Sequence, residues 1–161
     1  MLPEPSHLRV FVYGTLKQGG RNHPAYCRGI LAVEPARVLG QLYDLPAGYP
    51  MLVVPGTAVL AIGSSNYLHD AIRQDDDQRP PACAASAADD WQVIYGELLS
   101  FDDPLARLPA LDGLEDFRPG ESSLYARVLV RLLEPAGITA WTYVAPDGRL
   151  PPGARRCGSV W

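Results

Sequence analysis

Alternation of apolar and polar residues predicts that this chain of 161 residues is built mainly from strands. The clearest strands are expected at residues 8–13, 36–45, 91–101, 124–133 and 138–144, with a short apolar segment at 51–54. A turn that contains proline and glycine separates the last two strands, and the sequence therefore predicts that they pair as a hairpin.

Helical signals are fewer and shorter. Asn22 is placed as a helix cap with Pro24 in the first turn, which predicts a short helix that stops before Gly29. Leucines recur at every third position between 105 and 114, directly after Asp and Pro residues that favour a helix start. Because proline removes a helical hydrogen bond, we expect Pro109 to divide this helix into two pieces.

These elements predict a single α+β domain over residues 1–161. Strands outnumber helices, and the clearest late strands are sequence neighbours joined by a tight turn. A mostly antiparallel or mixed sheet is therefore expected, and such a sheet can close into a small barrel.

Residues 63–90 differ in composition from the rest of the chain. The segment is polar and acidic, with three consecutive aspartates, two adjacent prolines and a run rich in alanine and serine. A short helix is expected at 67–74, and the segment as a whole is predicted to be a mobile insertion because it offers little apolar surface to bury. Either a tolerated surface insertion or a functional loop fits this composition.

Composition argues against several classes of protein. Lys and Arg number 14 against 18 Asp and Glu, and the resulting net charge of −4 disfavours a nucleic-acid partner. No apolar run is long enough to cross a bilayer, and the first residues lack the pattern of a signal peptide. Three isolated cysteines favour a reducing compartment over a disulfide framework. We therefore expect a cytoplasmic protein with no membrane and no nucleic-acid partner.

Most recognisable catalytic and cofactor-binding motifs are absent from the sequence. The early glycines form neither of the common phosphate-binding patterns, there is no Gly-x-Ser-x-Gly, and the three histidines are scattered. An enzyme with this sequence is therefore expected to work without a metal, a bound cofactor or an obvious protein nucleophile.

Two features of the chain could still carry chemistry. Tyr13 to Leu16 reads Tyr-Gly-Thr-Leu, where a strand enters a glycine turn whose backbone N–H groups could bind an anion. Glu115 lies among leucines and a phenylalanine, and apolar surroundings would raise its pKa and suit it to proton transfer near neutral pH. Taken singly, each feature is better explained without function, by an ordinary turn at the end of a strand and by a solvated glutamate on a polar face.

The order of several motifs resembles one known family. The motifs follow one another along the chain: FVYGTLK near the start, Arg-Asn-His after a Gly-rich turn, a GELL strand, LDGLE, LYARVLV and AWTYV. This set resembles the γ-glutamylcyclotransferase-like family, in particular its γ-glutamylamine cyclotransferase and AIG2-like branch. The resemblance covers residues 8–60 and 91–145, and no counterpart is recognised for residues 63–90.

The resemblance implies a small mixed, mostly antiparallel β-barrel flanked by short helices. It also implies that a γ-glutamyl amine or amide is cyclised to 5-oxoproline, with release of the free amine and without a cofactor. Two alternatives stay open: deprotection of a γ-glutamylated biosynthetic intermediate, and a non-catalytic module that binds γ-glutamyl groups or 5-oxoproline. The implied partner is a small-molecule γ-glutamyl substrate, and the oligomeric state stays undetermined.

The same resemblance implies roles for individual residues. Glu115 is the general base, and it then becomes the acid that protonates the leaving amine. The substrate-binding residues that it implies are Tyr13, Gly14, Thr15, Leu16 and Tyr125. Gly14 is expected to let the backbone approach the bound carboxylate, because a Cβ would crowd it. Glu97 is expected to be structural.

Overall fold

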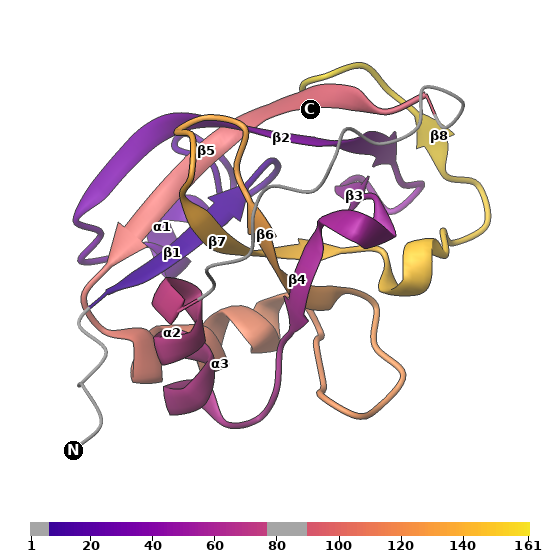
Figure 1. Ribbon diagram of the computed structural model, residues 1–161. Helices are drawn as coiled ribbons and strands as arrows, with labels where there is room; N and C mark the ends of the chain where they lie inside the picture. Colours follow the sequence, from indigo (N-terminus) through magenta and orange to yellow (C-terminus); the bar gives the residue numbers. More distant parts are fainter. Residues whose placement is uncertain (1–6, 77–89) are drawn as a thin grey trace.

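The computed structural model describes residues 7–76 and 90–161. Five strands form a closed circuit in the order β1 (Leu8–Val12), β5 (Gln92–Phe101), β2 (Ala32–Asp44), β3 (Pro50–Val53) and β7 (Thr139–Val144). The pairs β1–β5, β5–β2 and β2–β3 are antiparallel, whereas β3–β7 and β7–β1 are parallel. Because β7 returns to β1, the sheet closes into a small mixed barrel (Figure 1), which confirms the predicted α+β fold.

Further strands extend this barrel on two sides. β6 (Ala126–Arg131) pairs antiparallel with β7, from Ala126 opposite Val144 to Arg131 opposite Thr139. β4 (Val59–Ile62) continues the sheet beyond β6, and β8 (Arg155–Arg156) pairs with one end of β2. The hairpin that the sequence predicts near the end of the chain is therefore confirmed.

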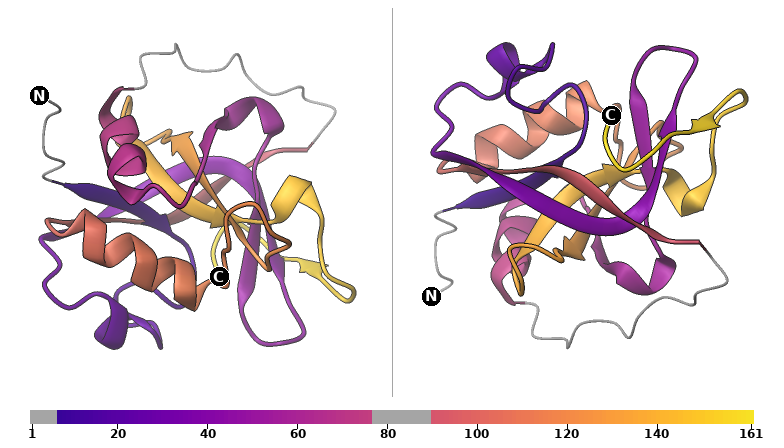
Figure 2. Two further views of the ribbon diagram at one scale, coloured as in Figure 1. Left: turned by 90° about the horizontal axis from the view of Figure 1, so that it is seen from below. Right: turned by 90° about the horizontal axis from the view of Figure 1, so that it is seen from above.

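The helices gather on one side of the barrel. The described residues hold α1 (His23–Tyr26), α2 (Tyr67–Asp76) and α3 (Pro104–Leu114), and the 3₁₀ turns η1 (Gly56–Ala58) and η3 (Pro146–Gly148). α3 lies between α1 and α2 (Figure 2). The guanidinium of Arg107 in α3 donates a 2.8 Å hydrogen bond to the carbonyl of Tyr26 in α1 and so connects the two helices. No helix within residues 7–76 and 90–161 is long and apolar enough to cross a membrane.

α3 is one continuous helix, so the expectation that Pro109 divides it is wrong. Pro109 lies in the middle of the helix. Its missing N–H leaves only the carbonyl of Leu105 without a helical donor. Leu105 is 51% exposed, so water can satisfy that carbonyl and the helix continues.

Residues 63–76 belong to the folded body of the protein. The predicted helix forms as α2, and the side chains of Asp70, Ala71 and Gln74 are at most 2% exposed. The mobility expected of residues 63–90 as a whole stays a prediction. The carboxamide of Gln74 accepts a hydrogen bond from the N–H of Arg9 and donates one to the carbonyl of His7. Residues 77–89, the rest of the expected insertion, lie outside the described residues.

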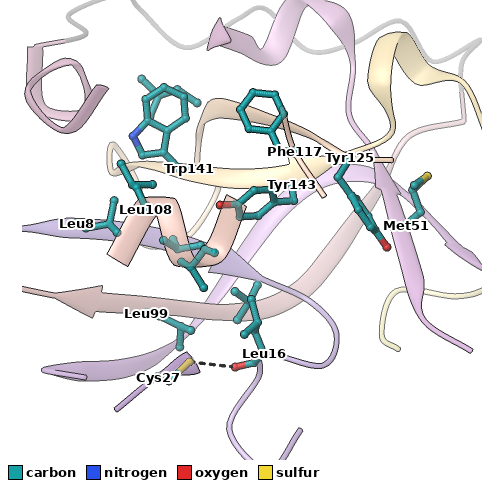
Figure 3. Close-up of a cluster of buried hydrophobic side chains, with 14 of the residues drawn as sticks. Leu8, Leu16, Cys27, Met51, Leu99, Leu108, Phe117, Tyr125, Trp141 and Tyr143 are labelled. Atoms are coloured by element: carbon teal, nitrogen blue, oxygen red, sulfur yellow. Dashed lines mark hydrogen bonds between the residues drawn. The ribbon is translucent and has the colours of Figure 1, made fainter. Parts of the chain in front are cut away.

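Two clusters of apolar side chains form the core, and strand alternation divides residues between them. In β1, Val10 and Val12 point to the cluster that packs against α3, whereas Phe11 points to the cluster formed by the barrel strands. Figure 3 shows the first cluster, in which Leu108 of α3 lies among side chains from the sheet. Because both faces of β1 are buried, its sequence is an almost unbroken apolar run.

Candidate active site

A cavity of about 280 Å³ lies between the loop that follows β1 and the C-terminal end of α3. It is near the lower end of the ~300–1,000 Å³ range of small-molecule sites, and its size therefore suits a small head group. Every residue that the sequence analysis assigned to a site lines this one cavity: Tyr13, Gly14, Thr15, Leu16, Glu115 and Tyr125.

The loop after β1 is held in one shape by its own hydrogen bonds. The carbonyl of Thr15 accepts the N–H of Asn22 at 2.9 Å, and the Asn22 side chain donates to the Thr15 hydroxyl at 2.9 Å. The carbonyl of Leu16 lies 2.8 Å from Nδ1 of His23. The predicted helix at Asn22 forms as α1, but the Asn22 side chain binds the loop instead of capping the helix.

This arrangement leaves a row of backbone donors beside the cavity. Within residues 7–76 and 90–161, the N–H groups of Gly14, Thr15 and Leu16 have no acceptor from the protein. Neighbouring N–H groups without acceptors form a partial positive charge that suits a carboxylate or an oxyanion.

The reason for a glycine at position 14 differs from the expected one. A Cβ built on Gly14 would lie 2.6 Å from Cγ of Pro50, at the start of β3. The side chain is therefore excluded by the protein itself, because β3 crosses directly over the turn. Crowding of a bound carboxylate is not needed to explain this glycine.

Glu115 is the C-terminal cap of α3, and its N–H donates to the carbonyl of Leu111 at 3.0 Å. The residue is half-buried and reaches the cavity from the end of the helix. Burial raises the pKa of the Glu115 carboxyl to about 7. A group with this pKa can both accept and release a proton near neutral pH.

Four tyrosines line the cavity with Glu115, and three of them, Tyr13, Tyr125 and Tyr143, donate hydrogen bonds to the protein. Tyr13 donates its hydroxyl hydrogen to the carbonyl of Tyr143 at 2.6 Å, and Tyr125 donates to the carbonyl of Pro50 at 2.6 Å. Tyr143 donates to Oδ1 of Asp112 at 2.7 Å. Burial raises the pKa of all three tyrosines, and the negative charge of Glu115 adds to the effect, so all three stay protonated at neutral pH.

A buried ionic cluster lies behind the cavity. Arg127 of β6 is 0% exposed; it donates to both oxygens of Asp112 at 2.8 and 3.2 Å and to Oδ2 of Asp70 at 3.1 Å. Asp70 also accepts from the N–H and the hydroxyl of Ser64. Because a buried charge is costly unless it is paired, this cluster fixes α2, α3 and β6 relative to one another.

The sequence analysis missed several residues of the site. Four further polar residues line the cavity: Arg21, Asn22, Tyr49 and Tyr143. Arg21, Asn22 and Tyr143 lie within motifs that carry the family resemblance, but nothing in the residue pattern distinguishes Tyr49. Arg127 could have been noticed as one of two arginines within the otherwise apolar run of a predicted strand.

Glu97 does not line this cavity. The carboxylate of Glu97 accepts a hydrogen bond from the N–H of Gln18, which is a structural contact with the loop after β1. Among the described residues, no group of three or more His, Cys, Asp or Glu side chains is placed to hold a metal ion.

The barrel and its cavity together define a small-molecule site with an ionisable glutamate and free backbone donors. A family model described as "Gamma-glutamyl cyclotransferase, AIG2-like" matches residues 10–68 and 62–159. These matches cover most of the chain, and the protein therefore belongs to the γ-glutamyl cyclotransferase, AIG2-like family. The resemblance that the sequence motifs indicate is thereby confirmed.

One curated relative and two solved structures are similar to this chain. Gamma-L-glutamyl-butirosin B gamma-glutamyl cyclotransferase from Niallia circulans is 27% identical over 137 residues, which are 84% of this chain and 65% of the relative. A uropathogenic E. coli-specific protein has a TM-score of 0.52 at 14% identity, covering 93% of this chain and 87% of its own. An AIG2-like protein from Mus musculus has a TM-score of 0.39 at 20% identity, covering 90% and 84%. The E. coli structure supports the fold alone.

Proposed function

We propose that this protein cyclises the γ-glutamyl group of an amine or amide to 5-oxoproline and releases the free amine. The observation that carries the proposal is the pairing, in one small cavity, of a carboxyl group that titrates near pH 7 with three unpaired backbone donors. Membership of the γ-glutamyl cyclotransferase, AIG2-like family supports it.

The reaction needs little from the protein beyond positioning and proton transfer. Glu115 takes a proton from the α-ammonium group of the substrate, and the resulting amine attacks the γ-carbonyl carbon of the same molecule. Because the nucleophile is intramolecular, its effective molarity is high without activation by a metal or a protein nucleophile. As the tetrahedral intermediate collapses, the bond between the γ-carbonyl carbon and the leaving nitrogen breaks, and protonated Glu115 gives its proton to that nitrogen. The Glu115 carboxylate then carries the extra proton of the ring nitrogen to the released amine, which leaves neutral 5-oxoproline N–H in the ring.

Backbone N–H groups of Gly14, Thr15 and Leu16 suit the two negatively charged parts of this substrate. They can hold the α-carboxylate and the oxyanion that develops on the γ-carbonyl oxygen. The hydroxyl groups of Tyr13 and Tyr125 donate their hydrogens to backbone carbonyls and have none left for the substrate. These two side chains therefore serve as walls of the cavity.

A second candidate differs only in the leaving amine. The name of the Niallia circulans relative describes a γ-glutamyl cyclotransferase that acts on γ-L-glutamyl-butirosin B. This similarity favours a role for the present chain in deprotecting a γ-glutamylated biosynthetic intermediate. A purely binding role is disfavoured by the presence of Glu115 in the cavity.

Incubation of the protein with a panel of γ-glutamyl compounds tests both candidates. The panel contains simple γ-glutamyl alkylamines, γ-glutamyl-lysine and γ-L-glutamyl-butirosin B, and 5-oxoproline and the free amine are measured. The compounds that release 5-oxoproline and the free amine in equal amounts identify the class of substrate. Tight binding of 5-oxoproline without turnover of any compound would support the binding module.

A further inference from the structure

Three of the tyrosine hydroxyl groups that line the cavity with Glu115 share one property: each donates its hydrogen to a different acceptor. Tyr13 donates to the carbonyl of Tyr143, Tyr125 donates to the carbonyl of Pro50, and Tyr143 donates to Asp112. A phenol has one hydrogen to give. None of these three hydroxyl groups therefore gives its hydrogen to Glu115, and their oxygens can act towards other groups only as hydrogen-bond acceptors.

Tyr143 differs from the other two because its acceptor is a charged side chain. Asp112 accepts the hydroxyl hydrogen at 2.7 Å, and Figure 3 shows the Tyr143 hydroxyl directed towards α3. Hydrogen bonds to an ionised acceptor are stronger than those between neutral groups. Arg127 holds the same carboxylate through two hydrogen bonds, so Asp112 cannot turn away from Tyr143.

We propose that Asp112 is a positioning residue for Glu115: it captures the hydroxyl hydrogen of Tyr143, so that Tyr143 faces the cavity as an acceptor only. The description of Glu115 as a base rests on the proposed function. A hydrogen bond donated to a carboxylate stabilises its charged form and makes it a weaker base. By holding this hydrogen, Asp112 keeps Glu115 basic and leaves the Tyr143 oxygen free to accept a hydrogen bond from an ammonium group.

The remaining charged and titratable groups near Glu115 come from several elements. Those that line the cavity with it are Tyr13 and Arg21 from the loop after β1, Tyr49 before β3, Tyr125 before β6 and Tyr143 from β7. Behind them lie Asp112 of α3, Arg127 of β6, and Asp70 and Tyr67 of α2. Asp116 follows Glu115 but is exposed and lies 3.7 Å from Arg118.

The test measures the pKa of Glu115 directly, by a ¹³C NMR titration of protein labelled at the glutamate carboxyl carbons. The Glu115 signal is identified by its loss in Glu115→Gln. Asp112→Leu removes the acceptor, Tyr143→Phe removes the hydroxyl, and a third variant carries both changes. If Asp112→Leu does not fold, the variant that carries both Asp112→Leu and Arg127→Met replaces it. The second change removes the buried arginine, which would otherwise lose the carboxylate of Asp112 as a partner.

In Asp112→Leu, the freed hydroxyl can donate to Glu115, and the pKa of Glu115 should fall by about one unit. In Tyr143→Phe and in the combined variant, no hydroxyl is present, and the fall should not occur. A fall of equal size in the combined variant would show that only the charge of Asp112 matters. A rise of a full unit in Tyr143→Phe would show that Tyr143 donates to Glu115 in the parent. Either result overturns the proposal.

The same variants separate this inference from the proposed function. The pH dependence of kcat/KM for 5-oxoproline formation is measured alongside the titration. If the pKa values move as expected but the kinetic profile does not follow them, the role of Asp112 stands and Glu115 is not the base.

Discussion

Arg127 of β6 lies 3.1 Å from a carboxylate oxygen of Asp70 in α2, and the two side chains are 0% and 2% exposed. The same guanidinium binds Asp112 in α3, three residues before Glu115. α2 is therefore connected, through one buried arginine, to the helix that positions the candidate base. A segment whose composition is typical of an insertion thus forms part of the framework of the site.

This connection predicts that Asp70→Ala is strongly destabilising. Breaking one partner of a buried ion pair costs about 3–5 kcal/mol in the free energy of unfolding, because the other charge is left without compensation. Asp75→Ala in the same helix is the matched control, since its pair with Arg9 is exposed and contributes about 1 kcal/mol or less. Urea denaturation measures both values, and similar losses for the two variants would contradict the prediction.

Gly14→Ala should lower stability by about 1–3 kcal/mol because its Cβ would collide with the ring of Pro50, as in other overpacked sites. Pro50→Ala removes the obstructing ring but keeps the carbonyl that accepts the Tyr125 hydroxyl. The double variant should therefore recover stability relative to Gly14→Ala alone. A double-mutant cycle with additive losses would show that contact with Pro50 is not the reason for this glycine.

Glu115→Gln should keep the fold and reduce the rate of 5-oxoproline formation by roughly 10²–10⁴-fold, the usual contribution of a positioned acid–base group. Glu121→Gln, on an exposed loop, is the control and should retain full activity. Circular dichroism checks the fold of both. A folded Glu115→Gln protein with normal turnover would remove Glu115 from the mechanism.

The activity should depend on pH through the same carboxyl group. A base must be deprotonated before it acts, so kcat/KM should rise as the pH increases through about 7, the raised pKa of Glu115. The measurement is the initial rate at low substrate concentration from pH 5 to pH 9. A midpoint near the ordinary carboxyl value of 4.5 would show that the residue is better solvated than its burial indicates.

Stability should depend on pH in the opposite sense. Burial raises the folded pKa of Glu115 above its unfolded value, so the folded state holds the proton more tightly, and this contribution is lost as the pH rises from 4.5 to about 7. Glutamine imitates the neutral form. Glu115→Gln should therefore be more stable than the parent at pH 8, by up to about 3 kcal/mol, with the difference shrinking as the pH falls towards 4.5. Thermal unfolding at several pH values measures this difference.

Arg21 is exposed at the cavity and forms no ion pair with the described residues, so its charge is available to an anionic part of a substrate. Arg21→Ala should raise KM by about tenfold, the effect of one charge-assisted hydrogen bond, and leave kcat nearly unchanged. Arg28→Ala, at an exposed position outside the cavity, is the control. An unchanged KM would assign substrate binding to the backbone donors alone.

The sequence by itself determined the strands of the barrel and the two motifs of the cavity. Strand periodicity is a local property: β1 and the β6–β7 hairpin are recognisable because alternate residues face alternate sides of a sheet. Glu115 and the Tyr13–Leu16 turn were recognisable because their motifs occur in a fixed order along the chain. Neither signal requires knowledge of which strand lies beside which.

Only the tertiary structure decided the contacts between distant segments. Pairing of β1 with β7 closes the barrel, and Pro50 crosses over Gly14, but no local pattern encodes either approach. The burial of Asp70 and Asp112 follows from a single arginine that reaches both, which reverses the usual expectation that aspartates face solvent. Local sequence sets the conformations available to a segment, whereas desolvation and hydrogen bonding depend on neighbours that are brought together only by the fold.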